Sequence, residues 1–146
     1  MRQNILTMLS ILKVLRIVQW SMLGSIPLCG VLGELAGPPP GRIDQTLSYI
    51  LSSLAVGVVG TIFVLRRTLV IPAAAGLTTN PGDGLSLNHW KTGYLATYAL
   101  CDALAMFGLV LRFRGSGLQQ SLLFYIGGFV LLAFFRPSLP GSRART

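Results

Sequence analysis

The stretch 47-LSYILSSLAVGVVGTIFVL-65, followed directly by Arg66 and Arg67, decides the fold class. It carries no charged residue. A helix that crosses the hydrocarbon core of a bilayer needs about 20 apolar residues, because each residue adds 1.5 Å, and this stretch is close to that length. In water, a chain of this size has too small a core to bury several such segments. The stretch is therefore predicted to be a transmembrane helix that ends at two basic anchors.

Three further segments have a similar character. The segment 118–135 is also uncharged, 92–111 carries the single charge Asp102, and 14–35 is the least regular because it contains Pro27. A proline inside a membrane helix kinks it or frees a carbonyl that neighbouring helices must satisfy. We therefore expect an all-α, polytopic membrane bundle of four transmembrane helices that forms one domain over residues 1–146. The predicted spans are 14–35, 47–65, 92–111 and 118–135.

Apolar residues also precede the first span, at Ile5, Met8, Leu9 and Leu12. Their spacing places them on one face of a helix, which favours either a short interfacial helix or an extension of the span. A cleaved signal peptide is the alternative interpretation. It is disfavoured because the apolar stretch is longer than a signal core and the residues before Gly37 form a poor cleavage site.

The composition excludes several protein classes. The 146 residues are 52% hydrophobic and 11% charged, with a mean hydropathy of +0.67, whereas soluble domains carry about 25% charged residues. This composition excludes a soluble enzyme, a disordered tail and a disulfide-stapled secreted domain. Cys29 and Cys101 both lie in apolar segments and are expected to pack as small apolar residues. The net charge of +8 does not predict nucleic-acid binding, because no basic run is interleaved with aromatic residues.

The basic residues predict an orientation. Nine of the 12 Lys and Arg residues fall on one side of a four-span topology and three on the other. The positive-inside rule then places both termini in the cytoplasm, together with a central loop at 66–91 and a basic tail at 136–146. The expected location is a plasma membrane of the bacterial type. Turn formers cluster in the central loop at 80–84.

The two halves of the chain share a faint similarity. Gln19-Trp20 recurs as His89-Trp90, and Tyr49-Ile50 recurs as Tyr125-Ile126. Two fused helical hairpins of the same topology would produce such a pattern. Chance similarity among apolar segments with aromatic ends would produce it as well, and both interpretations stay open.

Asp102 is the most informative polar residue. It lies near the middle of the span 92–111, where a carboxyl costs about 2.5 to 3.5 kcal/mol on insertion scales. No Lys, Arg or His occupies a comparable depth in any predicted span. We therefore expect Asp102 to be buried, to face another helix and to be mostly neutral at pH 7. Tyr98 lies one turn earlier on the same face and is predicted to share the site. The carboxyl either binds a proton or cation, or it packs as a protonated hydrogen-bonding group.

Small residues form a second stripe on the same span, and they predict close helix packing. The second span and the first span offer matching small faces, on Ser53, Gly57 and Gly60 and on Gly30 and Gly33 respectively. The stripe on the third span consists of Thr97, Cys101, Ala105 and Gly108.

The remaining polar residues predict no catalytic centre. Glu34 is expected to be a solvated charge at a helix end, and His89 with Trp90 an interfacial anchor. A single His cannot form a metal site without further ligands. The sequence contains no phosphate-binding glycine loop, nucleophile elbow or catalytic carboxylate pair. We expect no metal, no cofactor and no enzymatic activity.

The stretch 99-ALCDALAMFGLVL-111 resembles the carboxylate-bearing helix of the proteolipid (c) subunits of rotary ATPases. Those helices place an acidic residue in an Ala/Leu setting and a glycine six residues later. The resemblance implies that Asp102 binds a proton, and vacuolar-type members of the family are fused hairpins of four helices. The chain departs from the family in two respects. The glycine-rich first helix is missing from the second hairpin, and Asp102 lies on the first rather than the second helix of that hairpin.

Two functional classes follow. The first is a non-enzymatic structural or accessory membrane component, present as a homo-oligomer or within a larger membrane complex. The second is a proton- or cation-handling protein that uses Asp102. In both, the bilayer is the main partner.

Overall fold

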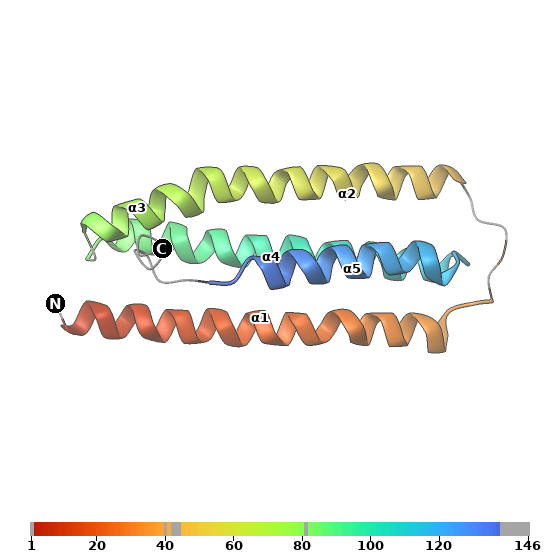
Figure 1. The fold of residues 1–146 in the computed structure, drawn as a ribbon, viewed down its shortest axis with the longest axis horizontal. Helices are drawn as coiled ribbons and strands as arrows, with labels where there is room; N and C mark the ends of the chain where they lie inside the picture. The colour runs from red at the N-terminus through yellow and green to blue at the C-terminus, as the bar shows by residue number, and fades with distance from the viewer. Residues whose placement is uncertain (1, 40, 42–44, 81, 138–146) are drawn as a thin grey trace.

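The computed structural model describes residues 2–39, 41, 45–80 and 82–137, and over these residues it contains helices and turns but no strand. The predicted all-α class is therefore confirmed for the described chain. The helices are long rods that lie side by side (Figure 1). The elements are α1 (Arg2–Ala36), α2 (Gln45–Leu65), the π-helical turn η1 (Arg66–Val70), α3 (Ile71–Thr79), α4 (Gly84–Phe113) and α5 (Leu118–Phe134).

α4 lies at the centre of the arrangement, because it contacts every other described element. α1 also packs against α5, whereas no described Cα atom of α1 lies within 8 Å of a Cα atom of α2. Figure 1 shows α1 and α2 on opposite sides of the α4–α5 pair. Successive rods run in opposite directions, so α5 returns toward the end of the molecule at which α1 begins. This up-and-down order follows from the short connections between the rods.

Three helical segments are long and apolar enough to cross a membrane. They are Met8–Ala36, Gln45–Thr79 and Gly84–Phe113. α5, which corresponds to the predicted fourth span, is a shorter apolar helix of 17 residues. Residues 138–146 of the predicted basic tail lie outside the described part of the chain.

α1 is longer than the predicted first span. It begins at Arg2 and continues without a break to Ala36, so the apolar residues before position 14 extend the span and do not form a separate interfacial helix. The helix also continues through Pro27. A membrane helix tolerates a proline when its surroundings satisfy the freed carbonyl.

The predicted central loop at 66–91 is wrong in extent. η1 and α3 continue the helix of α2 as far as Thr79, and α4 begins at Gly84, so only four residues separate α3 from α4. Pro72 explains the π turn, because a proline has no N–H and its ring crowds the carbonyl four residues earlier. The ladder adapts by widening, and the Ile71 N–H bonds the carbonyl of Arg66, five residues back. Arg66 and Arg67 mark the point at which the sequence becomes polar. The helix does not end at that point.

α4 and α5 approach each other closely at two glycines. A Cβ built on Gly128 would lie 2.8 Å from the carbonyl oxygen of Cys101, and one built on Gly108 would lie 2.9 Å from the carbonyl oxygen of Ser121. Real Cβ atoms essentially never come this close to a heavy atom. These two glycines therefore let the backbones of α4 and α5 pack in direct contact.

Candidate functional site

Asp102 projects from the middle of α4 toward α1. The Ser25 hydroxyl of α1 donates a hydrogen bond to its Oδ1 at 2.9 Å. The carboxyl thus faces another helix, but the residue is half-buried and not fully buried as predicted. The same serine oxygen lies 2.8 Å from the Met22 carbonyl oxygen. Ser25 was missed by the sequence analysis, because a serine in an apolar helix has no distinctive pattern around it.

Ser25 has one hydroxyl hydrogen and two acceptors within bonding distance. With an ionised carboxylate, the hydrogen can serve only one of the two acceptors at a time. Ser25 thus links the carboxyl group of α4 to the backbone of α1.

Tyr98 lies apart from this pair. Its side chain is completely buried, and its hydroxyl makes no hydrogen bond within the described residues. It belongs to a row of rings on α4, in which the Trp90 and Tyr94 centroids lie 5.2 Å apart and the Tyr94 and Tyr98 centroids 6.0 Å apart. The prediction that Tyr98 shares a site with Asp102 is not supported by any hydrogen bond between them in the described structure.

Trp90 is a core residue and not an interfacial anchor. Only 2% of it is exposed, whereas the adjacent His89 is exposed. An internal repeat would equate Trp90 with Trp20, which is 63% exposed. The two halves therefore use the recurring tryptophan in different environments.

Arg66 reaches from η1 over the same aromatic region. Its guanidinium carbon lies 4.1 Å from the centroid of the Phe135 ring and 5.7 Å from that of Tyr94. Its Nη1 atom is buried and has no hydrogen-bond partner within the described residues. A guanidinium over ring faces is stabilised by cation–π attraction. Arg66 therefore joins the end of α2 to α4 and to the residue that follows α5.

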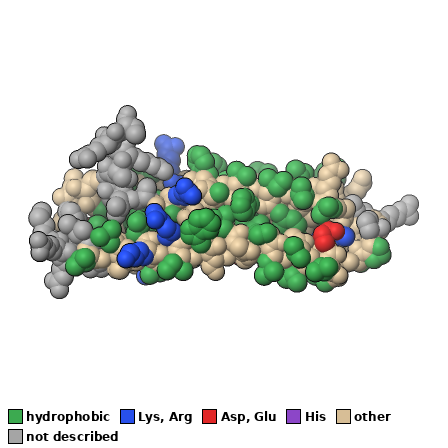
Figure 2. Space-filling view, turned by 60° about the horizontal axis from the view of Figure 1, so that its bottom comes forward, with side chains coloured by type: hydrophobic (Ala, Val, Ile, Leu, Met, Phe, Trp, Pro, Cys, Tyr) green, Lys and Arg blue, Asp and Glu red, His purple; other side chains and the backbone are tan. Residues whose placement is uncertain are grey.

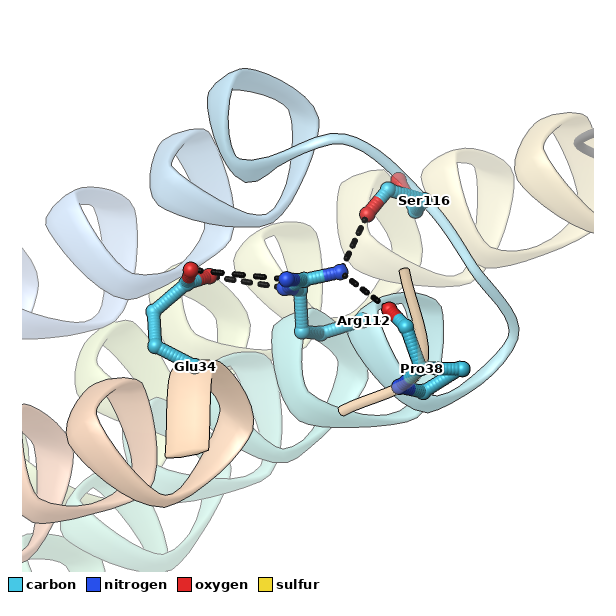
Figure 3. A network of polar contacts seen from close by, with 4 residues as sticks. All are labelled: Glu34, Pro38, Arg112 and Ser116. Atoms are coloured by element: carbon cyan, nitrogen blue, oxygen red, sulfur yellow. Dashed lines mark hydrogen bonds and ion pairs between the residues drawn. The ribbon is translucent and has the colours of Figure 1, made fainter. Parts of the chain in front are cut away.

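A second polar cluster lies at the C-terminal end of α4. Arg112 is 7% exposed, and its Nε and Nη2 donate to the two carboxylate oxygens of Glu34 at 2.7 and 3.4 Å. Its Nη1 donates to the carbonyl oxygens of Pro38 at 3.0 Å and Ser116 at 3.3 Å (Figure 3). This fork joins the end of α1, the turn after it and the α4–α5 connection.

Glu34 is therefore paired and is not the solitary solvated charge that the sequence predicted. A signal for the pair was present. Glu34 and Arg112 end the first and third spans, and in an up-and-down bundle these two ends lie at the same face of the membrane. A carboxylate and a guanidinium at one level are natural partners.

Part of the stripe of small residues on α4 packs against α5, where Gly128 lies against Cys101 and Ala105. Thr97, Cys101 and Ala105 have no exposed surface, and Gly108 meets α5 as described above. In contrast, a Cβ built on Gly57 or Gly60 of α2 would meet no described atom within 4 Å. These two glycines therefore meet no other helix within the described chain, and their role in helix packing stays a prediction. A groove of about 400 Å³ instead separates α2 from α5, lined by Ser52, Ala55, Val56, Val59, Leu104, Leu123, Phe124, Gly127 and Leu131.

No protein-family model, curated protein or solved structure matches this chain.

Proposed function

We propose that this chain is a four-span integral membrane protein that acts as a non-enzymatic structural or accessory component and pairs with a second copy through α2. The observation that carries the pairing is the open face of α2, where Gly57 and Gly60 meet nothing within the described chain. The proposal has two parts, which are the placement in the membrane and the contact between copies.

The spacing of charges supports four spans. Arg16 and Glu34 lie about 27 Å apart along α1 at 1.5 Å per residue, which is close to the hydrocarbon thickness of about 30 Å. α5, with 17 residues, is at the short end of the range of about 17 to 25 residues for spanning helices. The face containing α1 carries several Lys and Arg side chains toward one end and an acidic and a basic side chain at the other (Figure 2). The positive-inside rule favours a cytoplasmic location for the more basic end.

The composition of the α2 face supports pairing between copies. Ser53, Gly57 and Thr61 are exposed and recur every four residues, a spacing that aligns small residues along one side of a helix. The Thr61 hydroxyl already bonds the carbonyl of Gly57 at 2.8 Å, so it brings no unpaired donor into an interface. Small residues at this spacing let two transmembrane helices approach closely. One face that meets its own copy forms a closed twofold contact.

The test is cross-linking in liposomes, with a cysteine introduced at the proposed contact. Ser53→Cys should form a disulfide between two chains under mild oxidation, whereas the control Val31→Cys, at an exposed position on α1, should not. Gly57→Leu should abolish the cross-link of the Ser53→Cys chain. A monomer by mass in mild detergent, together with equal cross-linking at both positions, would contradict the pairing.

A second candidate function is proton or cation handling at Asp102. The half-buried carboxyl near the bilayer centre and its link through Ser25 to the backbone of α1 favour it. Asp102→Asn keeps the shape and hydrogen bonding of the side chain but cannot release a proton. Unchanged assembly with lost proton flux into liposomes would support this function. Unchanged flux would support a packing role for the residue.

A further inference from the structure

Two adjoining hollows lie on the flank formed by α1 and α5. The first, of about 280 Å³, is lined by Arg16, Gln19, Trp20, Leu23, Arg136 and Pro137. The second, of about 440 Å³, is lined by Trp20, Leu23, Gly24, Phe129, Ala133 and Arg136. The two share three residues, so they are continuous along the flank.

We propose that these two hollows together bind one anionic phospholipid. Its phosphate lies between Arg16 and Arg136, and one acyl chain follows the apolar hollow past Gly24. This site is separate from the open α2 face, because no α2 residue lines either hollow.

The charges of the first hollow call for an anion. Arg16 and Arg136 both line it, and neither has a carboxylate within 4.0 Å in the described part of the chain, where the one ion pair is that of Arg112 with Glu34. Two guanidiniums that line one hollow repel each other, and an anion bound between them removes this repulsion. The planar fork of arginine matches the oxygens of a phosphate. Basic pockets between transmembrane helices are also known to hold anionic lipid headgroups.

Gln19 adds a positioned polar group to this hollow. It is only 4% exposed, and its amide nitrogen donates to the Leu132 carbonyl oxygen of α5 at 2.9 Å. That bond occupies one of the two N–H groups of the amide and fixes the side chain at the wall of the hollow. The second N–H remains for an oxygen of the headgroup.

The depth of the two hollows distinguishes a lipid from a free anion. Gly24 lies about 12 Å farther into the membrane than Arg16 at 1.5 Å per residue, and Phe129 lies about 7.5 Å inside the end of α5 at Phe134. The second hollow is therefore at the depth of acyl chains, and apart from Arg136 at its rim its lining is apolar. Gly24 leaves this space open, since a Cβ there would meet no described atom within 4 Å. Trp20, 63% exposed between the two hollows, is suited to the level of the headgroups.

The test is the thermal stability of the full chain in micelles titrated with phosphatidylglycerol, phosphatidylcholine or inorganic phosphate. Phosphatidylglycerol should raise the melting temperature, and the other two should raise it much less. Arg16→Gln or Arg136→Gln should each weaken the apparent affinity for phosphatidylglycerol about fivefold. The matched control Arg114→Gln, which alters an exposed arginine at the other end of the bundle, should leave it unchanged.

Gly24→Leu separates the lipid from a free anion, because it fills the apolar hollow and leaves both arginines in place. We expect it to reduce the effect of phosphatidylglycerol. Equal protection by inorganic phosphate, or full protection of the Arg16→Gln/Arg136→Gln double variant, would overturn the proposal. Gly57→Leu should keep the lipid effect while it breaks the proposed pairing, so the two proposals can fail separately.

Discussion

The two neighbouring glycines of α5 give the sharpest test of how the helices pack. We predict that Gly128→Ala destabilises the protein relative to Gly127→Ala, although both changes add one methyl group to the same helix. A Cβ at Gly127 would meet no described atom within 4 Å, whereas one at Gly128 would lie 2.8 Å from the Cys101 carbonyl oxygen and 3.5 Å from the Ala105 backbone nitrogen.

The expected magnitude follows from two opposing effects. Alanine is a better helix former than glycine by about 1 kcal/mol, and this gain is shared by both variants. At Gly128 the obstacle is backbone, which cannot rotate away as a side chain can. Relief requires α4 and α5 to move apart, and overpacking of this kind costs about 1 to 3 kcal/mol. The two variants should therefore differ by about 1 to 3 kcal/mol in the free energy of unfolding.

Unfolding by SDS in mixed micelles, followed by tryptophan fluorescence, measures this difference. Trp90 is a suitable reporter because it is only 2% exposed in the folded protein. Gly127→Ala should unfold at an SDS fraction at least as high as the wild type, and Gly128→Ala at a clearly lower one. Equal midpoints for the two variants would refute the close contact between α4 and α5.

Three further outcomes are expected. Glu34→Gln should lower stability by about 1 to 2 kcal/mol, a value reduced by the exposure of the carboxylate, because the amide carries no charge and offers Arg112 one acceptor oxygen where the carboxylate offers two; an unchanged SDS midpoint would contradict this. Gly93→Ala should destabilise because its Cβ would lie 2.7 Å from Cγ2 of Val70, and Val70→Ala in the same chain should restore the loss. The Ser86 hydroxyl and the Leu85 N–H lower the pKa of Asp83 below its ordinary value of 3.8, so its carboxylate stabilises the start of α4 above that pH. This contribution to stability is lost as the pH falls through the lowered pKa. Asp83→Asn keeps the helix cap without the charge, so it should remove this pH dependence from thermal melts followed by circular dichroism.

The helical class was predictable because of the solvent. Inside a bilayer no water satisfies a free backbone N–H or carbonyl, so an uncharged segment such as 47–65 has to be helical if it crosses. The extent of the helix was not predictable in the same way. Hydropathy reports where a segment leaves the membrane, and the helix that contains Arg66 continues to Thr79 because alanines and a π turn support it.

Partner choice between helices was the other feature that the sequence left undecided. Small faces occur on α1, α2 and α4, and each satisfies the same packing rule. α5 has its own glycine pair, and Gly128 fits the backbone at Cys101. That match depends on three-dimensional register, which no spacing rule contains. By contrast, the pairing of Glu34 with Arg112 could have been inferred from topology, because both residues lie at the ends of odd-numbered spans.

The distribution of polar contacts separates a specified part of the bundle from an adaptable one. α1 is joined to its neighbours at three depths, through Gln19 to α5, through Ser25 to Asp102 of α4, and through Glu34 to Arg112 of α4. A slip of α1 by one turn, about 5.4 Å, would break all three contacts at once. Each break would leave a polar group in an apolar setting, so these contacts specify the register of α1. The outer face of α2 has no such constraint, since its exposed glycines meet nothing within 4 Å in the described chain. α2 can therefore accept a new neighbour without any loss of polar pairing inside the bundle, which is the property that the proposed contact between two copies requires.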